Sequence, residues 1–193
     1  MAVAVDLVKG ALDAHLQQGF DMRMSDRRAI RRGMLIAGAM WLGLSVEIFL
    51  SNVVFPSKSD EDGISLLVSY LCIFAALFLT GVLAARDGAG RKGQVLTGLV
   101  AGAMIGTLTV ATFALVDNVW LDIVAHQQAK IDGFAHSGAA SMREYINDGL
   151  VGAAVFLTVA LGVFGAALSL FGGLVGREPP SSSSAMAVKR TRS

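Results

Sequence analysis

Four long runs of apolar residues, separated by polar stretches, organise the sequence. They cover residues 33–55, 63–85, 93–116 and 149–175. Each run exceeds the roughly 20 residues that a helix needs to cross about 30 Å of hydrocarbon. Glu47 is the single charged residue in the first run, and the other three runs contain no charged residue. The pattern therefore predicts an all-α, polytopic membrane protein with a four-helix membrane domain over residues 33–176.

The stretches outside these runs have patterns of their own. Residues 1–32 begin with apolar side chains at helical spacing and end in a cluster of arginines, so we expect a cytoplasmic amphipathic helix followed by a basic flank. Residues 117–148 are too long for a turn and repeat the helical spacing, which predicts a helical segment on the outer side of the membrane. Residues 177–193 are rich in proline, serine and basic residues and are predicted to form a disordered cytoplasmic tail.

Composition supports the membrane class and excludes others. The chain of 193 residues is 54% hydrophobic and 16% charged, with a mean hydropathy of +0.61, whereas soluble domains are about 25% charged. A net charge of +1 excludes a nucleic-acid-binding protein that depends on a strong positive field. The single cysteine excludes an intrachain disulfide framework and a cysteine-based zinc site.

The basic residues are sorted to one side of the predicted spans. Lys58, Lys130 and Arg143 lie opposite the N-terminus, and the other 13 of the 16 lysines and arginines lie on the N-terminal side. Because cytoplasmic flanks are enriched in lysine and arginine, both termini are predicted to be cytoplasmic. The basic turn over residues 86–92 is expected to contact anionic lipid headgroups on this side. The strong charge sorting and the short connections favour the bacterial cytoplasmic (inner) membrane.

Small residues recur at four-residue spacing in the third and fourth spans. The two stripes are Gly98, Gly102 and Gly106, and Gly165, Ser169 and Gly173. Membrane helices associate where small residues let their backbones approach. We therefore expect these stripes to pack the third helix against the fourth. The alternative is that one stripe forms an interface in a homo-oligomer or in a larger membrane complex.

Glu47 is the residue of the predicted spans that most clearly suggests a functional role. An acid at the middle of a lone membrane helix costs roughly 2.5 to 3.5 kcal/mol, so such acids face a bundle interior and find a partner. Counting residues from the outer ends of the spans places Tyr70, Thr109 and Thr158 near the depth of Glu47, which predicts an intramembrane polar layer. A protonated Glu47 could hold the helices together by a hydrogen bond, or Glu47 could be a proton or cation site. The sequence favours the structural role, because a transport path normally needs more than one ionisable group.

The predicted outer segment contains two Asp-to-His pairs at four-residue spacing. These are Asp122 with His126 and Asp132 with His136. On helices each pair would share one face and could offer a metal mixed nitrogen and oxygen ligands. The spacing matches no established zinc motif, so polar residues on a solvated face are the favoured interpretation, and we expect no metal or cofactor.

Packing signals are plentiful in this sequence and reactive groups are scarce. The sequence contains no nucleophile elbow, no HExxH motif and no Walker glycine loop. It therefore predicts a non-enzymatic integral membrane protein, acting as a scaffold, assembly or accessory subunit through helix–helix contacts. The alternative function is a small oligomeric transporter or channel that uses Glu47. The lipid bilayer is the expected partner, and no nucleic acid is expected.

Overall fold

The computed structural model describes residues 24–55 and 63–177, and within these ranges the chain is helical without strands. Four helices are long and apolar enough to cross a membrane, which confirms the predicted all-helical, multi-pass class. These helices are α2 (Met24–Phe49), α3 (Gly63–Arg86), α4 (Arg91–Val119) and α7 (Met142–Val175). The amphipathic helix predicted within residues 1–32 falls largely outside the described residues, as does most of the predicted tail over residues 177–193.

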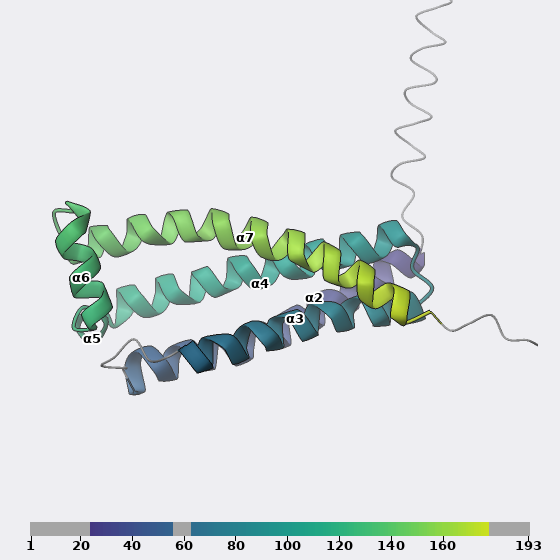
Figure 1. Ribbon diagram of the computed structural model, residues 1–193, viewed down its shortest axis with the longest axis horizontal. Helices are drawn as coiled ribbons and strands as arrows, with labels where there is room; N and C mark the ends of the chain where they lie inside the picture. Colours follow the sequence, from purple (N-terminus) through teal and green to yellow (C-terminus); the bar gives the residue numbers. More distant parts are fainter. Residues whose placement is uncertain (1–23, 56–62, 178–193) are drawn as a thin grey trace, which may run out of the picture.

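Three shorter elements complete the described chain. A π-helical segment, η1 (Leu50–Val54), continues α2 directly. The predicted outer segment contains two short helices, α5 (Leu121–Val124) and α6 (Gln128–Ser137). Together α5 and α6 form the cap, which lies across one end of the bundle (Figure 1). We call this end the cap end, and we call the opposite end, where α3 turns into α4, the turn end.

Polar residues extend the helices beyond the apolar runs. Helix α7 begins at Met142 rather than at residue 149 because its first turn is capped reciprocally. The backbone N–H of Glu144 donates to Ser141 Oγ at 3.2 Å, and the Glu144 carboxylate accepts from the backbone N–H of Ala140 at 2.9 Å. At 1.5 Å per residue, the 34 residues of α7 span about 51 Å, which exceeds the roughly 30 Å of a hydrocarbon core.

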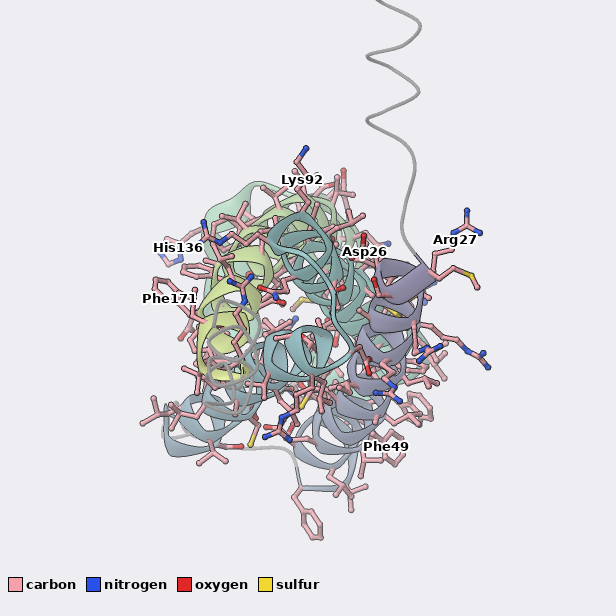
Figure 2. The ribbon with its side chains drawn as sticks, turned by 90° about the vertical axis from the view of Figure 1, so that its right-hand side faces the viewer. Asp26, Arg27, Phe49, Lys92, His136 and Phe171 are labelled. Carbon is pink, nitrogen blue, oxygen red and sulfur yellow. The ribbon has the colours of Figure 1, made fainter. Side chains whose placement is uncertain are left out.

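The four long helices form one bundle with an apolar centre. Helix α4 packs against α7 and α2, and α3 packs against α7 and α2. Figure 2 looks along the bundle from the turn end, where Arg27 and Lys92 project outward and Asp26 lies between helices. The buried centre is formed by Ala37, Leu44, Ile73, Leu77, Ala101, Ile105 and Leu161.

Helices α3 and α7 approach closely near the turn end and separate toward the cap end (Figure 1). A Cβ atom added to Gly81, Gly172 or Gly176 would come within 3.0 Å of the backbone of the facing helix. Nearer the cap end, α3 and α7 present bulky side chains such as Tyr70 and Leu157 instead. Small residues thus close one half of the interface, and large side chains hold the other half apart.

Candidate functional site

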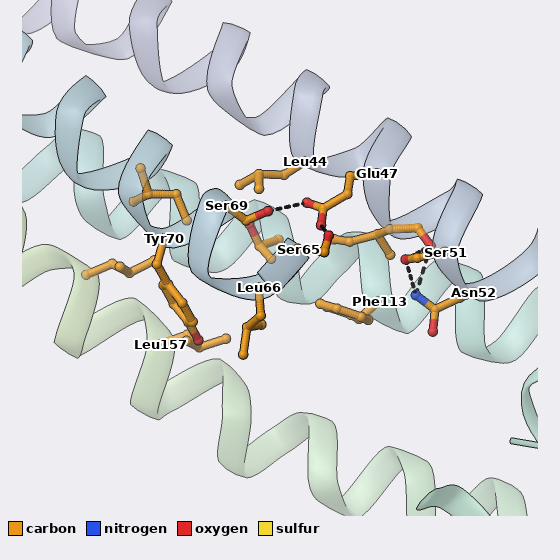
Figure 3. Close-up of a pocket in the computed structure, with 14 residues that line it drawn as sticks. Leu44, Glu47, Ser51, Asn52, Ser65, Leu66, Ser69, Tyr70, Phe113 and Leu157 are labelled. Atoms are coloured by element: carbon orange, nitrogen blue, oxygen red, sulfur yellow. Dashed lines mark hydrogen bonds between the residues drawn. The ribbon is translucent and has the colours of Figure 1, made fainter. Parts of the chain in front are cut away.

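Glu47 lies on α2 and its carboxylate is held by two serines of α3. Oε1 accepts a hydrogen bond from Ser65 Oγ at 2.9 Å, and Oε2 accepts one from Ser69 Oγ at 2.7 Å (Figure 3). The two serines are four residues apart, so they lie on one face of their helix. Both carboxylate oxygens therefore have neutral hydroxyl partners. The ion pairs among the described residues are Arg32 with Asp87 and Lys130 with Asp117, and neither includes Glu47.

Glu47 faces a cavity that all four long helices line. The cavity has a volume of about 350 Å³. Tyr70 lines it together with Glu47 (Figure 3), as does Thr109, and both are members of the predicted polar layer. The hydroxyl oxygen of Thr109 is buried and has no hydrogen-bond partner among the residues that the structure describes. The apolar part of the lining comprises Leu44, Ile48, Leu66, Ile73, Phe113, Leu157 and Leu161.

The cavity wall next to Glu47 is the π-helical segment η1. The π-helix is rare, and its turns are frequent at functional sites when they interrupt an α-helix; here the π-helical turn ends the helix that carries Glu47. Here Ser51 and Asn52 of η1 line the cavity. Asn52 Nδ2 donates to the Ile48 carbonyl at 2.8 Å, and Asn52 Oδ1 accepts from Gln127 Nε2 at 3.2 Å. The cavity wall is therefore linked directly to the cap.

Thr158 departs from the predicted polar layer. Its hydroxyl lies 3.1 Å from that of Thr107 in an exposed pair, and Leu157 and Leu161 are the α7 residues that line the cavity. Counting depth along a span ignores the rotation of the helix, and adjacent residues point about 100° apart. Thr158 is thus at the expected depth on the wrong side of α7. Ser65 and Ser69 were missed, although two serines at four-residue spacing in an apolar span were the available signal.

The two predicted stripes of small residues lie between α4 and α7. All six residues of the stripes are buried. A Cβ atom on Gly98 would meet the backbone of Gly165, and one on Gly102 would meet the backbone of Leu161. Ser169 Oγ donates to the Gln94 carbonyl at 2.8 Å, and Gly173 packs against the Gln94 side chain. Gly106 packs in the same way against the backbone of Leu157, so both stripes are occupied within the chain.

The residues of the two predicted Asp-to-His pairs are exposed, and each histidine ring contacts the backbone carbonyl of its paired aspartate. His126 Nδ1 lies 2.6 Å from the Asp122 carbonyl, and His136 Nδ1 lies 2.8 Å from the Asp132 carbonyl. Asp132 also accepts a hydrogen bond from Gln128. Within residues 24–55 and 63–177, no three His, Cys, Asp or Glu side chains come together in a way that could hold a metal.

The cavity brings one carboxylate together with hydroxyl, phenol and amide groups. A carboxylate in such surroundings can bind a proton or a cation, since it supplies negative charge and the neutral groups supply hydrogen bonds. Among the described residues that line the cavity, none is basic, so none of them would neutralise Glu47. Among known proteins, no family model, no curated protein and no solved structure matches this chain.

Proposed function

We propose that this chain is a small, non-enzymatic membrane transporter or channel protein in which Glu47 binds a proton or a cation. The observation that carries the proposal is that Glu47 faces a cavity of about 350 Å³. A purely structural acid would be sealed against the neighbouring helices. Ionisable groups inside spans are costly and commonly mark ion or proton pathways.

The contacts of Glu47 are compatible with reversible binding of a proton or a cation by its carboxylate. Neutral hydroxyls of Ser65 and Ser69 hold the carboxylate, so no permanent cation has to be displaced. The unpartnered hydroxyl of Thr109 supplies another polar atom at the cavity wall. A π-helical segment also begins at Leu50, three residues after Glu47, which is the kind of irregularity that functional sites often contain.

The scaffold or accessory role has less support. The alternative use of a small-residue stripe as a partner surface is not supported, because Gly102 and Gly165 are buried between α4 and α7. A scaffold would have to use the large apolar side chains that α3 and α7 expose, which any lipid-facing helix would also expose. The transporter or channel role is the more specific of the two.

The proposed orientation places the turn end in the cytoplasm. Arg27 and Lys92 project outward at this end (Figure 2), and Arg28 and Arg177 are exposed there. These side chains suit anionic lipid headgroups, and cytoplasmic flanks carry such an excess of basic residues. Glu47 would then lie in the outer half of a bacterial inner membrane. A homo-oligomer remains the expected assembly for a transporter of this size.

Ion flux through reconstituted protein tests the proposal. The full chain is placed in liposomes that contain a pH-sensitive dye, and proton uptake is driven by a potassium diffusion potential, with ²²Na⁺ uptake measured in parallel. Flux of at least one ion is expected to exceed that of empty liposomes. Glu47→Gln is expected to lower that flux at least tenfold, because the amide keeps one acceptor for Ser65 or Ser69 but carries no charge.

Two variants serve as controls for this experiment. Asp148→Asn removes an acid that is exposed on α7 and is expected to leave the flux unchanged. Glu47→Asp keeps the carboxylate and is expected to retain part of the flux. Wild-type flux in Glu47→Gln, or wild-type protein that conducts neither ion, would contradict the proposal.

A further inference from the structure

We infer that the cavity beside Glu47 takes a lipophilic organic ammonium ion, an inference that rests on the proposed role of Glu47 as a cation site. The charge of the ligand follows from the lining. Of the residues that the structure describes along the cavity, Glu47 is the single charged one, and both of its oxygens contact neutral hydroxyls. A cation would compensate this charge, and an anion would be repelled by it.

The size and polarity of the cavity favour an organic cation over a metal ion. A volume of about 350 Å³ falls within the roughly 300–1,000 Å³ of small-molecule sites, which are mainly apolar with a few polar groups. Calcium would require six to eight oxygen ligands, and magnesium a near-ideal octahedron. The lining instead supplies leucines and isoleucines from α2, α3 and α7, including Leu44, Ile73 and Leu161, and Phe113 from α4. The alkyl or aryl groups of an ammonium ion would fill this apolar part.

Two further features suit an ammonium group. The rings of Tyr70 and Phe113 line the cavity with Glu47, and aromatic faces attract quaternary ammonium ions. The Thr109 hydroxyl has no partner and can accept a hydrogen bond from a protonated amine. Acid, aromatic rings and a free hydroxyl thus surround one apolar space (Figure 3).

The route of entry also favours a lipophilic ligand. Leu66 is 57% exposed and Tyr70 is 39% exposed, so two lining residues of α3 reach the outer surface of the bundle. That surface would face lipid in a membrane. A hydrated inorganic ion would not cross hydrocarbon to reach these residues, whereas apolar substituents lower the cost of bringing an ammonium ion to them.

Equilibrium binding of radiolabelled benzyltrimethylammonium to the full chain in lipid nanodiscs tests the inference. This probe has a fixed charge, an aromatic ring and no N–H group, and neopentylbenzene is its neutral analogue of the same shape. We expect saturable binding of benzyltrimethylammonium that excess sodium does not displace and that neopentylbenzene does not displace. Glu47→Gln is expected to weaken the binding at least tenfold.

A second variant keeps the carboxylate and removes the space. Leu157→Trp replaces an aliphatic side chain at the cavity wall by a larger indole ring and is expected to weaken binding at least tenfold. Val155→Trp introduces the same ring on the same helix at a position that is 66% exposed, and it is expected to bind like the wild type. Loss of binding in Leu157→Trp alone would show that the ligand occupies this cavity.

The outcomes separate this inference from the proposed function. Absence of ammonium binding together with Glu47-dependent proton or sodium flux overturns the ligand class and leaves the cation site in place. Ammonium binding that Glu47→Gln and Leu157→Trp leave unchanged also overturns the inference, because the probe would then bind elsewhere. Absence of both binding and flux overturns the inference and the proposed function together.

Discussion

Replacing Gly102 by alanine is expected to lower the free energy of unfolding by about 3 kcal/mol. The added methyl group would be placed against the backbone carbonyl of Leu161 on α7, closer than real side-chain carbons come to any atom. A backbone cannot move aside as a flexible side chain does, so α4 and α7 would have to separate. Unfolding of the purified protein in mixed micelles, followed by circular dichroism, measures the effect.

Gly152 supplies a matched control on α7. A Cβ atom at Gly152 would meet nothing within 4 Å, and alanine is a better helix former than glycine by roughly 0.8–1.0 kcal/mol. Gly152→Ala is therefore expected to leave stability unchanged or to raise it slightly. Equal loss in Gly152→Ala and Gly102→Ala would show that helix flexibility, and not the close contact with Leu161, determines the cost.

The positions of the spans could be predicted because membrane helices require long apolar runs. Pairing of the stripes was also within reach, since Gly98 and Gly165 begin stripes of the same spacing on neighbouring spans. The ends of the helices were harder to predict from the sequence. Ser141 and Glu144 extend α7 by capping hydrogen bonds at its N-terminus, and a hydropathy pattern does not reveal such bonds. Residues of the cap could not be assigned to partners, because Gln127 meets Asn52 across a separation of 75 residues.

The sequence indicated the depth of the candidate-site residues along the spans, but not the direction in which their side chains point. Glu47, Tyr70 and Thr109 line one cavity, as depth along the spans indicated. Thr158 does not line it, because the rotation of α7 is set by the close packing of Gly102 and Gly165. Fixing that rotation from sequence would require knowing which faces of α4 and α7 meet. The glycine contacts thus determine which α7 residues face Glu47.

The cavity itself follows from the same packing. Close approach at Gly81 and Gly172 joins α3 to α7 near the turn end, and Leu157 and Tyr70 keep the helices apart near the cap end. Phe49 and Trp120 pack edge to face at 5.2 Å between α2 and the start of the cap. The cap thereby fixes the far end of α2, so the space beside Glu47 is bounded by rigid contacts at both ends.

Lys130→Met is expected to destabilise the protein by about 3 kcal/mol, because it leaves the charge of Asp117 buried without a partner. Asp117 lies in the last turn of α4 and is 1% exposed. Its Oδ2 atom lies 3.0 Å from Lys130 Nζ on α6, and its Oδ1 atom has no partner. Within residues 24–55 and 63–177, the lysine therefore supplies the one ion pair that compensates this carboxylate. Unfolding in mixed micelles, as for Gly102→Ala, measures the loss.

The two partners of this ion pair are not equivalent, and their difference is the sharper test. Asp117→Asn is expected to cost less, about 1 kcal/mol, because the side chain of Lys130 is 29% exposed and its ammonium group can turn to water. Combining Asp117→Asn with Lys130→Met is expected to recover most of the loss of Lys130→Met, since no buried charge remains. Lys92→Met, at an exposed position of α4, is the control for removing a lysine. A double variant as unstable as Lys130→Met would show that the cap depends on the packing of the lysine chain rather than on the charge of Asp117.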